Sequence, residues 1–225
     1  MGVVVISNLE VDSLPQSPGR LRREDSIRGS VIYTPSLHGV TMATAKTGSF
    51  YLTETVALPA GSASGTRVQG TIDLGAYVNV ATGQAVAVES VDFVIQTGTG
   101  LSQELEGMVQ SNGAISFQVS DLNPGTSFVR ADDQSLIASG ALNIDFSNNI
   151  GSETADFYPD NFGPSALSEA FMVVNDSLYL VAGNNGALTN AASDLFVTAR
   201  IKARIVKLGS KDWMAIAIQS TASDN

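Results

Sequence analysis

Hydrophobic and polar residues alternate along much of this chain, a pattern that predicts β-strands with two differently solvated faces. Long stretches with the 3.6-residue period of an amphipathic helix are missing. Segments rich in Gly, Asn and Ser separate the alternating stretches and predict turns. We therefore expect ten strands, at about Ser30–Thr34, Ser49–Val56, Arg67–Leu74, Ala85–Thr97, Ala114–Leu122, Leu136–Phe146, Phe171–Val174, Ser177–Val181, Phe196–Leu208 and Met214–Gln219.

The segment "AVAVESVDFVIQ" shows what these strands face. Strict alternation would place Ala87, Glu89, Val91, Phe93 and Ile95 on one face, and Val86, Val88, Ser90, Asp92 and Val94 on the other. Each face mixes apolar and polar residues, so we expect the strand to be buried on both sides, as in a packed sandwich.

The most regular strand is also the most basic one. Its apolar positions are Val197, Ala199, Ile201, Ala203 and Ile205, and its polar positions are Thr198, Arg200, Lys202 and Arg204, with Lys207 following. Three interpretations are open: a solvated outer face, a contact between copies of the chain, or an inward patch for an anionic membrane or packaged nucleic acid. As residues of a contact between subunits we select Arg20, Arg22, Arg23, Arg200, Lys202, Arg204, Lys207 and Trp213.

Charge is distributed unevenly along the 225 residues. The net charge is −10, and residues 29–199 carry three basic residues against 16 acidic ones, whereas residues 200–225 carry five basic residues against two. An acidic chain does not suit general nucleic-acid binding, so we do not expect direct contact with nucleic acid. Charged residues make up only 15% of the chain, which suits surfaces that become buried against neighbouring subunits.

Two segments depart from the strand pattern. Residues 1–29 contain two prolines, charges of both signs and few large apolar residues in their later part, and we interpret them as a flexible arm. Residues 147–169 form a long loop within the sandwich domain, which we place at residues 30–225. Asn175 and Asp176 form either a two-residue hairpin turn or the middle of one continuous strand.

Residue patterns that would indicate an enzyme are not found. The chain has no cysteine, and its single histidine, His38, lies in a turn-like context without a nucleophile motif. Carboxylate pairs at Glu104/Glu106, Asp132/Asp133 and Asp156/Asp160 are best explained as solvated loop acids. The oxygen-rich loops around Asp145 and Asp160 would suit calcium, but Asx turns explain them better, so we expect no cofactor. The first residues do not resemble a signal peptide and no apolar run could span a bilayer, so we expect a soluble chain.

Many short strands, Gly-rich turns and few helical patterns predict an all-β, antiparallel β-sandwich, best explained as a single jelly roll. An immunoglobulin-like sandwich is the second choice, although its Cys–Trp–Cys signature is missing. With its arm, its Gly/Ala/Ser/Thr-rich strands and its final segments "LFVTARIKARIVKL" and "DWMAIAIQ", the chain resembles the single jelly-roll major capsid proteins of tailless icosahedral viruses of archaea and bacteria that enclose a membrane.

The resemblance implies a non-enzymatic, self-assembling structural protein of the virion, assembled in the host cytoplasm. Its partners would be further copies of itself, with a second capsid protein or an internal viral membrane as additional candidates. No catalytic residue carries over from this resemblance. The alternatives are a carbohydrate-binding or cell-surface β-sandwich module, which would use Phe157, Tyr158 or Trp213, and a filament subunit that exchanges its arm between copies.

Overall fold

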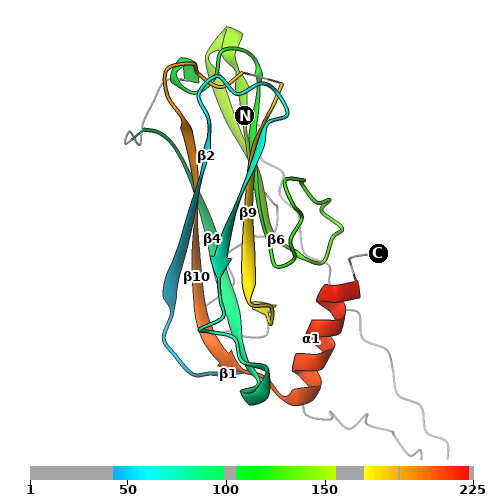
Figure 1. Cartoon of the computed structure of the whole chain (residues 1–225). Coiled ribbons are helices and arrows are strands. Elements are labelled where there is room, and N and C mark those ends of the chain that lie inside the picture. Colours follow the sequence, from blue (N-terminus) through cyan, green and yellow to red (C-terminus); the bar gives the residue numbers. More distant parts are fainter. Residues whose placement is uncertain (1–42, 99–104, 156–169, 187, 223–225) are drawn as a thin grey trace, which may run out of the picture. The chain divides into compact units, whose positions relative to one another are not determined.

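The computed structural model describes residues 43–98, 105–155, 170–186 and 188–222, and the expected arm and the expected strand at 30–34 lie outside them. Ten strands, three short 3₁₀ helices and one α-helix follow one another along these residues (Figure 1). In order they are β1 (Thr44–Ala45), β2 (Phe50–Leu58), β3 (Arg67–Asp73), η1 (Val80–Thr82), β4 (Gln84–Thr97), η2 (Leu105–Gly107), β5 (Gly113–Ser120), β6 (Leu136–Asp145), η3 (Phe146–Asn148), β7 (Ile150–Ala155), β8 (Phe171–Val173), β9 (Ser177–Asn185), β10 (Leu195–Lys207) and α1 (Ser210–Ala222).

The strand pairing is that of a jelly roll. Strands from the first half of the fold pair with strands from the second half in reverse order: β2 with β10, β3 with β9, β4 with β8 and β5 with β6, all antiparallel. This long hairpin is then rolled up, because β10 also pairs with β4 and β9 also pairs with β5. A wrapped hairpin of eight strands in two Greek keys defines the jelly roll, so the predicted fold class is confirmed.

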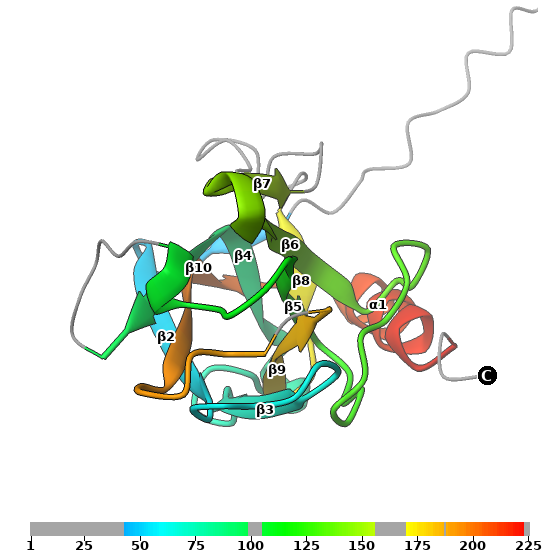
Figure 2. The same cartoon turned by 90° about the horizontal axis from the view of Figure 1, so that it is seen from above.

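Two five-stranded sheets result (Figure 2). The first sheet runs β2–β10–β4–β8, with β1 pairing with the end of β10 beyond β2, and the second runs β3–β9–β5–β6–β7. The main hydrophobic core takes side chains from both sheets, and the alternation predicted for the basic strand holds: Val197, Ala199, Ile201 and Ala203 of β10 are all fully buried in it.

A β-bulge in β4 overturns the two faces predicted for "AVAVESVDFVIQ". Lys202 of β10 lies opposite Ser90 and Ala203 lies opposite Val88, so Glu89 is an extra residue between them. Because β4 has one residue more than β10 at this point, the inward and outward side chains of β4 exchange sides after the bulge. The core therefore receives Val86 and Val88 before the bulge and Val91, Phe93 and Ile95 after it.

The strand predicted at Met214–Gln219 is wrong, since these residues lie in helix α1. Trp213, Ile216 and Ala217 pack against a second, smaller hydrophobic cluster, which lies outside the main core. The spacing i, i+3, i+4 places these three side chains on one side of a helix, whereas Met214 and Ile218 are more than 60% exposed. The second cluster also contains Ala85 and Ala87 of β4 and Val206 of β10, so α1 covers the outer side of the first sheet.

Two connections also differ from expectation. The first part of the expected loop at 147–169 contains β7, which pairs with β6, while residues 156–169 lie outside the described ranges. Asn175 and Asp176 are neither a hairpin turn nor part of a strand. They join β8 in the first sheet to β9 in the second, and the backbone oxygen of Asp176 accepts a hydrogen bond from Leu74.

Candidate functional site

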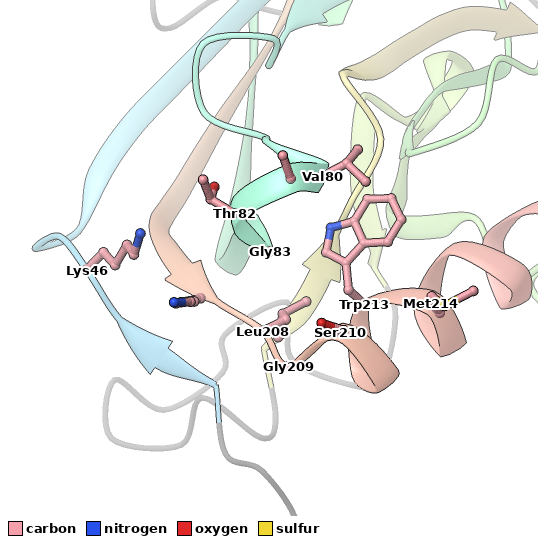
Figure 3. Close-up of a pocket in the computed structure, with 11 residues that line it drawn as sticks. Lys46, Val80, Thr82, Gly83, Leu208, Gly209, Ser210, Trp213 and Met214 are labelled. Carbon is pink, nitrogen blue, oxygen red and sulfur yellow. The ribbon is translucent and has the colours of Figure 1, made fainter.

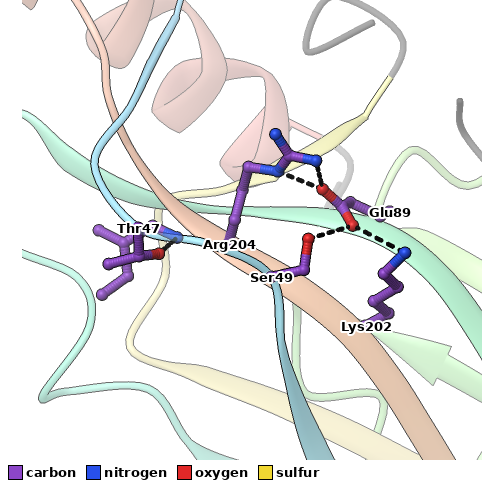
Figure 4. Close-up of polar contacts among 6 residues, drawn as sticks. Thr47, Ser49, Glu89, Lys202 and Arg204 are labelled. Atoms are coloured by element: carbon purple, nitrogen blue, oxygen red, sulfur yellow. Dashed lines mark hydrogen bonds and ion pairs between the residues drawn. The ribbon is translucent and has the colours of Figure 1, made fainter. Parts of the chain in front are cut away.

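Glu89 is a buried carboxylate surrounded by the cations of the basic strand (Figure 4). Only 3% of the residue is exposed, yet Arg204 donates from its guanidinium to Oε1, and Lys202 Nζ lies 3.5 Å from Oε2. Ser49 Oγ donates to Oε2 over 2.8 Å. Burial raises the pKa of Glu89, but the hydrogen bonds from Ser49 and Arg204 and the nearby positive charges outweigh it and hold the pKa below its usual value.

This cluster explains half of the basic strand without a partner molecule. The side chains of Lys202 and Arg204 are only 34% and 15% exposed, and both charges face the carboxylate that the bulge brings to this position. Buried charges are tolerated where they are paired and hydrogen-bonded. Within the chain, these two residues therefore act in joining β10 to β4.

Arg200, on the same strand, lies in a different environment. It is exposed and lies opposite Asp92 of β4 and Thr53 of β2 in the strand register. Its guanidinium carbon stands 5.5 Å from the ring centroid of Tyr51, a cation–π contact in which the ring is itself 56% exposed. Arg200 and Tyr51 thus form a solvent-facing pair on the outer side of the first sheet.

Lys207 and Trp213 line an open pocket of about 860 Å³ at the start of α1 (Figure 3). Lys46, which follows β1, stands at the same pocket, and its backbone N–H donates to Ile205 of β10. Residues 80–83 form the opposite wall, held by a hydrogen bond from the backbone N–H of Leu208 to the backbone oxygen of Gly83. We call this site the basic pocket: it is defined by Lys46, Lys207, Trp213 and the first turn of α1.

The geometry of the basic pocket depends on Gly83. Its φ of 67° lies in the left-handed region, and a Cβ there would stand 2.6 Å from the backbone oxygen of Leu208. Glycine therefore allows the 80–83 turn to approach the start of the helix. In the described part of the chain Lys46 and Lys207 make no ion pair, and Trp213 Nε1 is buried without a hydrogen-bond partner.

Acidic residues collect at the same end of the sandwich, around the connections that follow β3 and β5 and precede β9. Asp73, Asp132 and Asp176 are exposed, and we call these three residues the acidic end. Asp132 pairs with Arg130 over 3.3 Å, with both side chains more than three-quarters exposed. Asp133, predicted as a solvated loop acid, instead accepts hydrogen bonds from the backbone and hydroxyl of Ser135, as in an Asx turn.

Asp121 lies buried beneath this acidic end. The residue is 2% exposed, its Oδ1 has no hydrogen-bond partner, and Asn175 Nδ2 donates to its backbone oxygen over 3.0 Å and to Oδ2 over 3.3 Å. Burial raises the pKa of Asp121 to about 7, and the nearby charge of Asp133 adds to the rise. The Asn175 contacts link the end of β5 to the crossing between the two sheets.

Most of the remaining residues selected from the sequence lie outside the described ranges. Arg20, Arg22, Arg23, His38, Glu104, Asp156, Phe157, Tyr158 and Asp160 all lie outside the described residues. Asp145 caps η3 by accepting from the Asn148 backbone, and the described residues contain no cluster of three His, Asp or Glu side chains placed to hold a metal. No helix among the described residues is long and apolar enough to cross a membrane.

Sequence reasoning missed Glu89, Asp121 and Lys46. A bulge has no distinct signature in "VESVD", so the pairing of Glu89 could not be seen. Lys46 carried a usable signal, because it is one of only three basic residues between positions 29 and 199. Asp121 resembled other acids near strand ends, and its burial comes from residues distant in sequence.

The sequence matches no protein-family model and no curated protein. Among solved structures, an archaeal virus protein described by a triple jelly-roll fold and turret assembly is 17% identical, with a TM-score of 0.31. That match covers 73% of this chain, and the chain spans only 30% of the length of that protein. VP1 of Trichodysplasia spinulosa-associated polyomavirus, solved with 3'-sialyllactose, is 11% identical over 76% of this chain and 99% of its own, with a TM-score of 0.39. A structure of Desmodium yellow mottle tymovirus is 11% identical over 89% of this chain and 98% of its own, with a TM-score of 0.26.

Proposed function

We propose that this chain is a structural coat protein that assembles with copies of itself into the shell of a virion. The observation that carries the proposal is the strand topology, because the eight-stranded jelly roll is an architecture of viral capsid proteins. The finer assignment, to a tailless icosahedral virus of archaea or bacteria with an internal membrane and assembly in the host cytoplasm, is supported by the sequence resemblance alone.

The surface chemistry supports assembly through specific contacts. The basic pocket and the acidic end carry opposite charges within one chain, and complementary charge sets orientation and partner choice in protein association. Arg200 and Tyr51 add a solvent-facing cation–aromatic pair of the kind enriched at interfaces.

Light scattering after size-exclusion chromatography, with electron microscopy of any large fraction, tests the proposal. The full chain would be measured across a series of salt and calcium concentrations. We expect shells, rings or sheets. A folded monomer under every condition would overturn the proposal, and a glycan screen would then test the carbohydrate-binding alternative, for which lectin domains share this fold.

A further inference from the structure

The basic pocket and the acidic end lie at the same end of the sandwich. β10 ends at Lys207, directly opposite Gln84 at the start of β4, and β3 ends at Asp73, opposite Ser177 at the start of β9. Residues 74–83 connect these two places, so one surface carries the lysines and another nearby carries the exposed carboxylates.

Neither surface is neutralised by the described part of the chain. Lys46 and Lys207 make no ion pair there, and of the acidic end only Asp132 has a basic partner, the highly exposed Arg130. An ion pair this exposed contributes little. Within the described residues, both surfaces therefore present charge to solvent.

No ion pair joins the two surfaces within the described part of one copy. Lys207 and Asp73 are fixed by continuous ladders, because β10 pairs with β4 over its whole length and β3 pairs with β9 over its whole length. A second copy of the chain meets no such constraint. A contact between two different patches of identical subunits is head-to-tail, and it closes into rings or continues into extended assemblies.

We propose that the basic pocket of one copy receives the acidic end of a neighbouring copy. This contact rests on the proposed function, since it supplies the subunit interface that a coat protein requires. Lys46 and Lys207 would face the carboxylates of Asp132 and Asp176 across the interface. The amino end of α1 adds a positive helix dipole beside the two lysines. Asp212 does not line the pocket, so its charge does not oppose an incoming carboxylate directly.

Charge reversal on each surface tests this contact. One variant carries Lys46→Glu and Lys207→Glu, a second carries Asp132→Lys and Asp176→Lys, and a third combines all four changes. Lys211→Glu is the control, because it reverses one lysine in the nearby first turn of α1 that does not line the pocket. Circular dichroism would first establish that every variant is folded. Assembly is then followed by light scattering against protein concentration.

Each two-site variant should need at least about tenfold more protein to assemble, whereas the Lys211→Glu variant should assemble like the wild type. Mixing the two reversed variants, or combining all four changes in one chain, should restore assembly, because each reversed pocket then meets a reversed acidic end. The inference is overturned if the two-site variants assemble normally, or if neither mixing nor combination restores what they lose. A wild-type chain that never assembles would instead overturn the proposed function.

Discussion

At the scale of single residues, Glu89 decides how the basic strand is used. Removing one partner from a buried ion pair is costly, because the remaining charge loses its compensation without regaining water. Here one carboxylate, 3% exposed, compensates both Lys202 and Arg204. The apparent excess of positive charge on β10 is therefore largely balanced by the neighbouring strand.

We expect Glu89→Gln to lower the free energy of unfolding by about 3 kcal/mol, since two cations lose their carboxylate while keeping part of their contact with water. Asp92→Asn is the control, because Asp92 lies on the same strand but is exposed, and a change below about 0.5 kcal/mol is expected. Urea titration monitored by circular dichroism measures both values. Equal effects of the two substitutions would contradict the role assigned to Glu89.

Asp121 should make stability depend on pH. Its pKa is raised to about 7 in the folded chain, so between its unfolded value near 4 and pH 7 the folded state holds a proton that the unfolded state releases. Stability should therefore fall as pH rises through this window, by up to about 4 kcal/mol from this one group. Below the unfolded pKa the penalty is absent, and above pH 7 it is constant.

Asp121→Asn should remove this component. The difference in unfolding free energy between the wild type and the variant, measured by urea titration from pH 4 to pH 8, should change steadily in favour of the variant. Asp132→Asn, at an exposed position, should leave the pH profile unchanged. A pH-independent difference for Asp121→Asn would show that the carboxyl is ionised throughout.

At the scale of elements, local pattern located strands well where the alternating side chains meet a core on one side. It failed where tertiary packing takes priority. Residues 182–185, "AGNN", suggest a turn, yet they extend β9 because they pair with β3 and β5. A Cβ at Gly183 would come within 3.0 Å of Arg67 and Thr66, and Asn184 is fully buried. The glycine at position 183 is therefore explained by the close approach of the neighbouring chain segment and not by a local preference for a turn.

The end of the chain shows the opposite limit. In "WMAIAI" alternate positions are apolar, but so are positions three and four apart, and both periods fit. The helix is selected because its side chains at Trp213, Ile216 and Ala217 cover the second hydrophobic cluster, which sequence alone does not reveal. The bulge at Glu89 was hidden for the same reason.

Two isoleucines distinguish the helix from the strand experimentally. In a strand, Ile216 and Ile218 would share one face, whereas in α1 Ile216 packs against the second cluster and Ile218 is 64% exposed. We expect Ile216→Ala to cost about 1–2 kcal/mol of unfolding free energy and Ile218→Ala to cost less than about 0.5 kcal/mol. Thermal or urea unfolding measures both. Similar losses at the two positions would favour a strand.

At the scale of the whole molecule, the sandwich class could be predicted from strand number and turn chemistry, but the pairing of strands could not. β2 pairs with β10 across nearly the entire fold, and no local signal states this partnership. The jelly roll was expected from the resemblance as much as from the residues, and the pairing register now supplies its physical basis.

Removal of residues 1–29 should leave this sandwich folded, because residues from position 43 onward already supply both sheets and two packed hydrophobic clusters. The shortened chain should unfold cooperatively at the same urea concentration as the full chain, measured by circular dichroism. A chain that no longer folds would show that the segment supplies a strand of the core. A chain that folds but no longer assembles would place the segment in contacts between copies.

The central position of β10 has a consequence for synthesis. β10 lies between β2 and β4, and it comes last along the chain among the described strands, so the ribosome makes it after both neighbours. Until residue 207 has emerged, β2 and β4 both lack this neighbour, and such unpaired strand edges favour aggregation. Chains whose translation stops before residue 207 should therefore aggregate, and they should not form folded but incomplete subunits. Closure of the first sheet by β10 would thus restrict the pool of folded subunits to chains translated through residue 207.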